Sequence, residues 1–98
     1  MLKAKDLVTI AEEAAVQAEV YALNTREIYH LLGESHDKAA ELTTLAALAA
    51  DRAYDACHFA KKAYKKKHYA KLLRETLLAV SFCEVAKENM LLLRVVGQ

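Results

Sequence analysis

Apolar residues recur at alternating intervals of three and four along most of the chain. The first series comprises Leu7, Ala11, Ala14, Ala18, Tyr21, Thr25, Ile28 and Leu32. This spacing is a heptad seam, the pattern of a helix that buries one side against other helices. The pattern predicts a first helix over residues 2–32. Asn24, with Glu27 three residues later, has the form of a capping box and would allow a kink there.

The residues after this helix carry a stop signal followed by a start signal. Gly33 suits the position just past a helix end, and Ser35 suits an N-cap with Asp37 in the next turn. A second helix is therefore predicted over residues 36–66. Its seam is almost entirely alanine: Ala39, Leu42, Ala46, Ala49, Ala53, Ala56, Ala60 and Ala63. Small seam residues let helix axes approach to the short end of the usual range of about 8–10 Å.

A third helix is predicted over residues 69–96. Its seam is Leu72, Thr76, Ala79, Cys83, Ala86, Met90 and Leu93, which we expect Leu73, Val80 and Leu91 to widen. No Gly, Pro, Asn, Asp or Ser lies between Ala56 and Val80, so the turn before this helix is weakly marked. We place it at residues 66–68. The alternative is one long helix from Ser35 to Val96, in a helical hairpin that oligomerises into a four-helix-type bundle.

These patterns predict an all-α fold, an up-down-up three-helix bundle with alanine-rich heptad seams. The 98 residues are enough for a single helical domain, residues 1–98, with one core. No uncharged run approaches the roughly 18 residues that a membrane-spanning helix needs. No signal peptide is recognisable, and two cysteines without a CxxC spacing behave as reduced core residues. We therefore expect a soluble, cytoplasmic protein.

The polar side of the third helix also carries an apolar stripe. Leu78, Val85 and Leu92 follow one another at seven-residue spacing, opposite the seam. A repeating stripe of this kind indicates that another helix packs there, since single exposed leucines are common but aligned ones are not. We expect these three residues to form the interface of a homo-oligomer.

Charge is concentrated in residues 61–74. The basic residues of this segment are Lys61, Lys62, Lys65, Lys66, Lys67, Lys71 and Arg74. The segment has no acid and carries +7, which leaves −6 for the rest of a chain with net charge +1. We call residues 61–74 the basic pole, and its seven Lys and Arg residues are the candidate anion-binding residues. In a three-helix bundle Lys3 and Lys5 come to the same end and add to its positive charge. Such a pole attracts polyanions, and Tyr64, His68 and Tyr69 could stack on unpaired bases.

Motifs of catalysis or metal binding are weak. Glu27 with His30 and Asp55 with His58 have the carboxylate–histidine spacing of bundle di-iron sites. Both histidines point away from the seams and lie at different levels of the bundle, so they cannot share a metal within one chain. A metal shared between subunits stays open. Ser35, His36 and Asp37 are consecutive and cannot act on one another as a triad. We assign no catalytic residue, no metal ligand and no cofactor.

The function expected from these features is a non-enzymatic helical protein-interaction module, a small adaptor or regulatory subunit that self-associates. The first alternative is an accessory protein that binds nucleic acid or another polyanion through the basic pole. A metal-binding helical bundle is a further alternative, and an enzyme would need a site formed between subunits.

Overall fold

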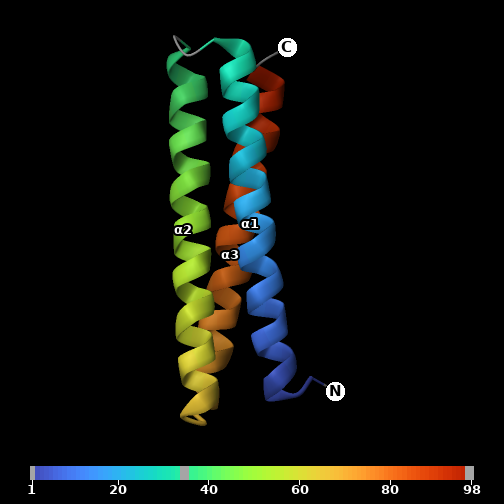
Figure 1. The fold of residues 1–98 in the computed structure, drawn as a ribbon, viewed down its shortest axis with the longest axis vertical. Coiled ribbons are helices and arrows are strands. Elements are labelled where there is room, and N and C mark those ends of the chain that lie inside the picture. The colour runs from blue at the N-terminus through green and yellow to red at the C-terminus, as the bar shows by residue number, and fades with distance from the viewer. Residues whose placement is uncertain (1, 34–35, 97–98) are drawn as a thin grey trace.

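Three long helices form the fold in a computed structural model that describes residues 2–33 and 36–96. They are α1 (Ala4–Leu32), α2 (Asp37–Lys65) and α3 (Tyr69–Val96). The chain runs up, down and up, and each helix packs against the other two (Figure 1). This confirms the predicted three-helix bundle, which measures 48 × 21 × 15 Å. None of the described helices has an apolar stretch long enough to cross a membrane.

The turn between α2 and α3 excludes the single long helix from Ser35 to Val96. The His68 N–H donates to the Ala63 carbonyl at 2.9 Å, and the Lys67 N–H donates to the Tyr64 carbonyl at 3.1 Å. These two bonds form a Schellman motif, which closes a helix with one residue in the left-handed conformation. Lys67 is that residue, with φ of 60°. Glycine usually occupies this position, so a lysine there explains why the sequence marks the turn so weakly.

The connection between α1 and α2 differs from the prediction in two details. α1 continues through Asn24, so the capping box there does not interrupt the helix. α2 has His36 as its N-cap, because the His36 Nδ1 accepts a hydrogen bond from the Ala39 N–H at 3.2 Å. The predicted cap, Ser35, lies outside the described residues.

The core consists of three clusters stacked along the bundle, and alanine dominates two of them. All eight seam residues predicted for α2 are buried. Small side chains bring the backbones close enough for the Thr76 hydroxyl of α3 to donate to the Leu7 carbonyl of α1 at 3.3 Å. The larger side chains Leu42 and Leu93 pack at one end of the bundle, and Leu72 packs at the other.

A core this narrow leaves many apolar side chains uncovered. Leu73, Val80 and Leu91, predicted to widen the α3 seam, are 47%, 36% and 43% exposed. That expectation is wrong because alanine seams draw the helices together, and residues flanking the seam then lie outside the contact. The accessible surface is 6477 Å². A typical folded chain of this mass exposes about 5,600 Å². The bundle therefore exposes more surface than its size requires.

Candidate functional site

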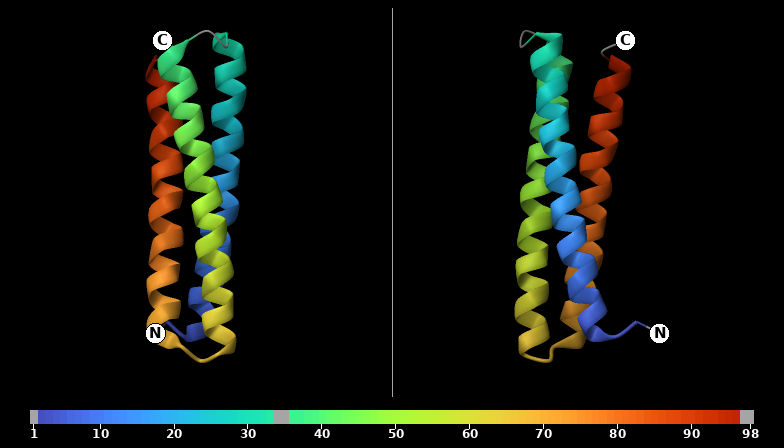
Figure 2. Two further views of the ribbon diagram at one scale, coloured as in Figure 1. Left: turned by 90° about the vertical axis from the view of Figure 1, so that its left-hand side faces the viewer. Right: turned by 45° about the vertical axis from the view of Figure 1, so that its right-hand side comes forward.

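The side of α3 that faces away from α1 and α2 is the first candidate surface (Figure 2). Leu78, Val85 and Leu92 are 39%, 40% and 53% exposed, so the predicted stripe is uncovered in a single chain. We call this surface the α3 outer face. It comprises Arg74, Leu77, Leu78, Ser81, Glu84, Val85, Glu88, Leu91, Leu92 and Val95, all of which are exposed.

The two halves of the α3 outer face differ in shape and in charge. Ala70, Leu73, Arg74, Leu77, Leu78 and Ser81 line a shallow hollow of about 310 Å³ in its N-terminal half. Arg74 is the basic residue of that half, whereas Glu84 and Glu88 are the acidic residues of the C-terminal half. The two halves therefore have opposite charge and both carry exposed leucine or valine.

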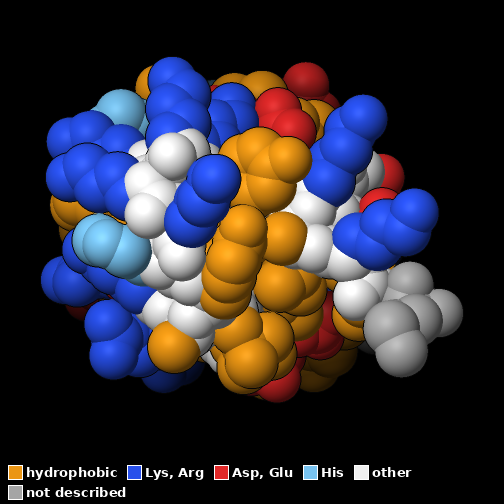
Figure 3. Space-filling model, turned by 90° about the horizontal axis from the view of Figure 1, so that it is seen from below, with side chains coloured by type: hydrophobic (Ala, Val, Ile, Leu, Met, Phe, Trp, Pro, Cys, Tyr) orange, Lys and Arg blue, Asp and Glu red, His pale blue; other side chains and the backbone are white. Residues whose placement is uncertain are grey.

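The basic pole is the second candidate surface. The N-terminus of α1 and the turn between α2 and α3 lie at one end of the bundle, as expected (Figure 1). Seen from that end, Lys and Arg side chains lie on either side of a strip of hydrophobic side chains (Figure 3). All seven basic residues between positions 61 and 74 are exposed. Their surroundings nevertheless divide them into two groups.

Two members of the basic pole interact with other side chains. The Lys61 Nζ lies 3.2 Å from the Glu12 Oε2, and this bond is the first cause of the raised pKa of Lys61. The Lys71 Nζ lies 5.8 Å from the centre of the Phe59 ring. Within the described ranges, no carboxylate forms an ion pair with Lys62, Lys65, Lys66, Lys67 or Arg74. These five residues are the members of the basic pole that the structure leaves available to an anion.

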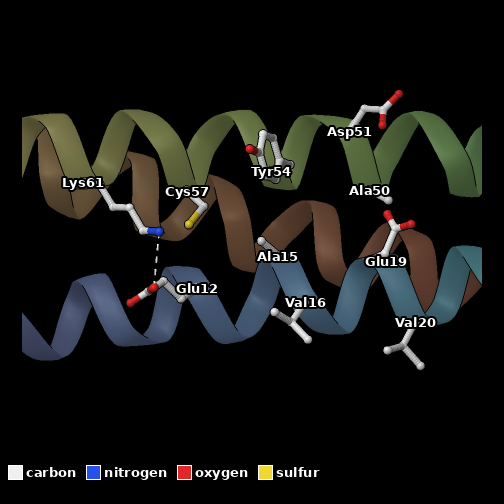
Figure 4. Close-up of a pocket in the computed structure, with 10 residues that line it drawn as sticks. All are labelled: Glu12, Ala15, Val16, Glu19, Val20, Ala50, Asp51, Tyr54, Cys57 and Lys61. Atoms are coloured by element: carbon white, nitrogen blue, oxygen red, sulfur yellow. Dashed lines mark ion pairs between the residues drawn. The ribbon is translucent and has the colours of Figure 1, made fainter.

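A groove between α1 and α2 is the third candidate, and sequence analysis did not anticipate it. Its volume is about 570 Å³, and its lining includes Ala15, Ala50, Tyr54 and Cys57 (Figure 4). The two alanines leave the groove open because neither side chain reaches across it. Burial raises the pKa of the Cys57 thiol, so this thiol is neutral and a weak nucleophile at pH 7. The groove shows no paired nucleophile and base.

The residues considered for metal binding do not gather into a set of three or more ligands among those that the structure describes. His30 and His58 are exposed, as the heptad pattern predicts. Across residues 2–33 and 36–96, no three His, Cys, Asp or Glu side chains come together as metal ligands. Cys57 and Cys83 are free thiols. No observation therefore favours the metal-binding alternative.

Comparisons of this chain with protein-family models, curated proteins and solved structures found no match.

Proposed function

We propose that this protein is a helical interaction module that self-associates through the α3 outer face and has no enzymatic activity of its own. One observation carries the proposal: α3 has large apolar side chains on the side turned away from α1 and α2 as well as on the side that these helices cover. A repeating stripe of exposed apolar side chains on the polar side of a helix indicates a further packing partner. A small adaptor or regulatory subunit that functions through helix contacts fits this surface. The two free thiols fit the reducing cytoplasm.

The exposed apolar side chains are sufficient to drive weak association. Six of them lie on the α3 outer face with exposed fractions between 39% and 67%: Leu77, Leu78, Val85, Leu91, Leu92 and Val95. Burying the exposed half of such a side chain contributes about 1 kcal/mol. Two copies would then gain roughly 12 kcal/mol, which is comparable to the association cost of about 4–15 kcal/mol. A weak dimer is the expected result.

Val85→Glu tests self-association. A carboxylate in the middle of the stripe would be desolvated without a partner, so the variant should sediment as a monomer at concentrations where the wild type is associated. Val85 is 40% exposed, so the isolated chain should keep its helicity by circular dichroism. Leu23→Glu on α1 is the matched control, since Leu23 is 49% exposed on another helix. Equal sedimentation of wild type and Val85→Glu would contradict the proposal.

Binding of single-stranded nucleic acid at the basic pole is the second candidate function. The conformation of Lys67 supports it, because a lysine at φ of 60° is less stable than glycine at the same position. Three successive lysines, Lys65, Lys66 and Lys67, also repel one another at this turn. A turn that keeps an unfavourable residue in a repulsive cluster is expected where the charge has a function. Tyr64 and Tyr69, 39% and 53% exposed, are available to stack on bases.

Two variants separate binding from folding at this turn. Reversing Lys65, Lys66 and Lys67 to glutamate should abolish binding of a single-stranded oligonucleotide in fluorescence anisotropy. Lys67→Gly should weaken binding slightly and lower the salt slope of log K by about 0.7, while raising the free energy of unfolding by about 1 kcal/mol. Opposite effects on affinity and stability are the signature of a functional lysine. Undiminished binding by the triple reversal would exclude the basic pole as the site.

A further inference from the structure

We propose that the occupant of the α3 outer face is a second copy of this chain, bound antiparallel, with the twofold axis passing at Ser81. This inference rests on the proposed self-association and specifies its geometry. In a dimer with one twofold axis, each residue contacts its counterpart reciprocally. An axis at Ser81 brings together residues whose numbers add up to about 162. The charges and the apolar side chains of the face both fit this arrangement.

The charges determine the direction of the second copy. Arg74 precedes Ser81 by seven residues and Glu88 follows it by seven, so the three share one line along α3, about 10.5 Å apart at each step. In the antiparallel dimer Arg74 of each copy lies opposite Glu88 of the other. A parallel dimer would instead place Arg74 against Arg74 and Glu88 against Glu88. Like charges in contact oppose association, so the antiparallel direction is favoured.

The apolar stripe leads to the same axis independently. Leu78 lies three residues before Ser81 and Val85 lies four residues after it. An axis at Ser81 therefore places Leu78 of one copy within one residue, about 1.5 Å, of the level of Val85 of the other. Both residues lie on the same flank of α3, and a twofold axis perpendicular to α3 keeps that flank aligned between copies. The stripe is thus complementary to itself.

The shape of the face is consistent with this contact. The hollow in the N-terminal half, lined in part by Leu77 and Leu78, lies opposite Val85 and Glu88 of the second copy. Ser81 itself is small and exposed, so two α3 helices can approach closely at the axis. Each copy fills the hollow of the other, and Arg74 on its rim meets Glu88.

A charge swap tests the arrangement. Arg74→Glu and Glu88→Arg should each weaken the dimer at least tenfold in sedimentation equilibrium, because each creates two like-charge contacts. The double variant carrying both changes should return to within about threefold of the wild-type Kd. In 1 M salt the single variants should approach the wild type, since the screening length falls to about 3 Å. Arg26→Glu on α1 is the control and should leave the Kd unchanged.

A cysteine at the axis tests the same geometry without charge. Only a residue on the twofold axis lies next to the same residue of the other copy. The two residue 81 Cα atoms should then lie within the range of about 4.4–6.8 Å that a disulfide needs, so Ser81→Cys should form a disulfide-linked dimer on mild oxidation. Glu88→Cys and the wild type should stay unlinked. A monomeric wild type would overturn the proposed function itself. A wild-type dimer that Val85→Glu disrupts, but that the double charge swap does not restore, would overturn only the antiparallel arrangement.

Discussion

Burial controls the chemistry of the two thiols. Cys57 is 6% exposed in the core cluster that contains Leu72, and Cys83 packs against that cluster from α3. Desolvation by burial is the first cause of the raised pKa of both thiols, and the nearby charge of Lys61 offsets it only in part for Cys57. A neutral thiol is neither a good nucleophile nor a good metal ligand. The two cysteines therefore act as small core residues.

The raised pKa of Cys57 predicts a loss of stability at alkaline pH. Below the ordinary thiol pKa of about 8.5, both the folded and the unfolded thiol are neutral, and ionisation adds nothing to the free energy of unfolding. Above that pH the unfolded thiol ionises first, which favours the unfolded state. The free energy of unfolding, measured in guanidinium between pH 7 and 10, should fall more steeply with pH for the wild type than for Cys57→Ala. Parallel declines would contradict a buried, neutral thiol.

The alanine seam of α2 makes the helix sensitive to added volume. Ala60 is fully buried where α2 meets both neighbours, whereas Ala47 on the same helix is exposed. Ala60→Leu should lower the free energy of unfolding by about 1–3 kcal/mol or more, because three further carbons must separate the helices. Ala47→Leu should change it by less than about 0.5 kcal/mol. Thermal unfolding of the two variants distinguishes them, and equal melting temperatures would show that the seam is not tightly packed.

The helices were predictable from the sequence because heptad spacing specifies which side of each helix is buried. The predicted bounds agree with α1, α2 and α3 to within two residues. The helix ends were less predictable, since they depend on local hydrogen bonds. His36 replaces a serine cap, and Lys67 adopts a conformation that glycine usually provides. Neither residue type is distinctive for its role, so the pattern alone could not identify them.

For the whole molecule, the sequence predicted the exposed apolar and basic surfaces, but it did not predict which side chains of neighbouring helices contact each other. The heptad positions predicted that Leu78, Val85 and Leu92 are exposed along one stripe. The predicted turn between the second and third helices placed the basic pole at one end of the bundle. The pairing of Lys61 with Glu12 and the groove beside Cys57 depend on which flanks of α1 and α2 face each other. A heptad pattern gives the buried side of each helix, but it does not give the order of the helices around the axis.

The two proposed interfaces overlap at Arg74. Arg74 belongs to the basic pole, and in the antiparallel dimer it faces Glu88 of the second copy. A nucleic acid that recruits Arg74 would therefore compete with dimer formation, whereas Lys65, Lys66 and Lys67 lie about 10 Å or more away along α3 and the turn. Association and polyanion binding should be measured on the same variants for this reason.

The alanine core has a consequence for the alignment of the helices. From Ala46 to Ala63 the α2 seam repeats every seven residues with the same side chain, so a slip of one heptad, about 10.5 Å, replaces alanine by alanine. These alanines by themselves do not oppose such a slip. A slip would, however, disrupt the packing of Leu42 with Leu93 at one end and of Leu72 at the other. It would also break the hydrogen bond from Thr76 to Leu7. The bulky residues at the two ends therefore help to fix the sliding register that the alanine seam alone does not specify.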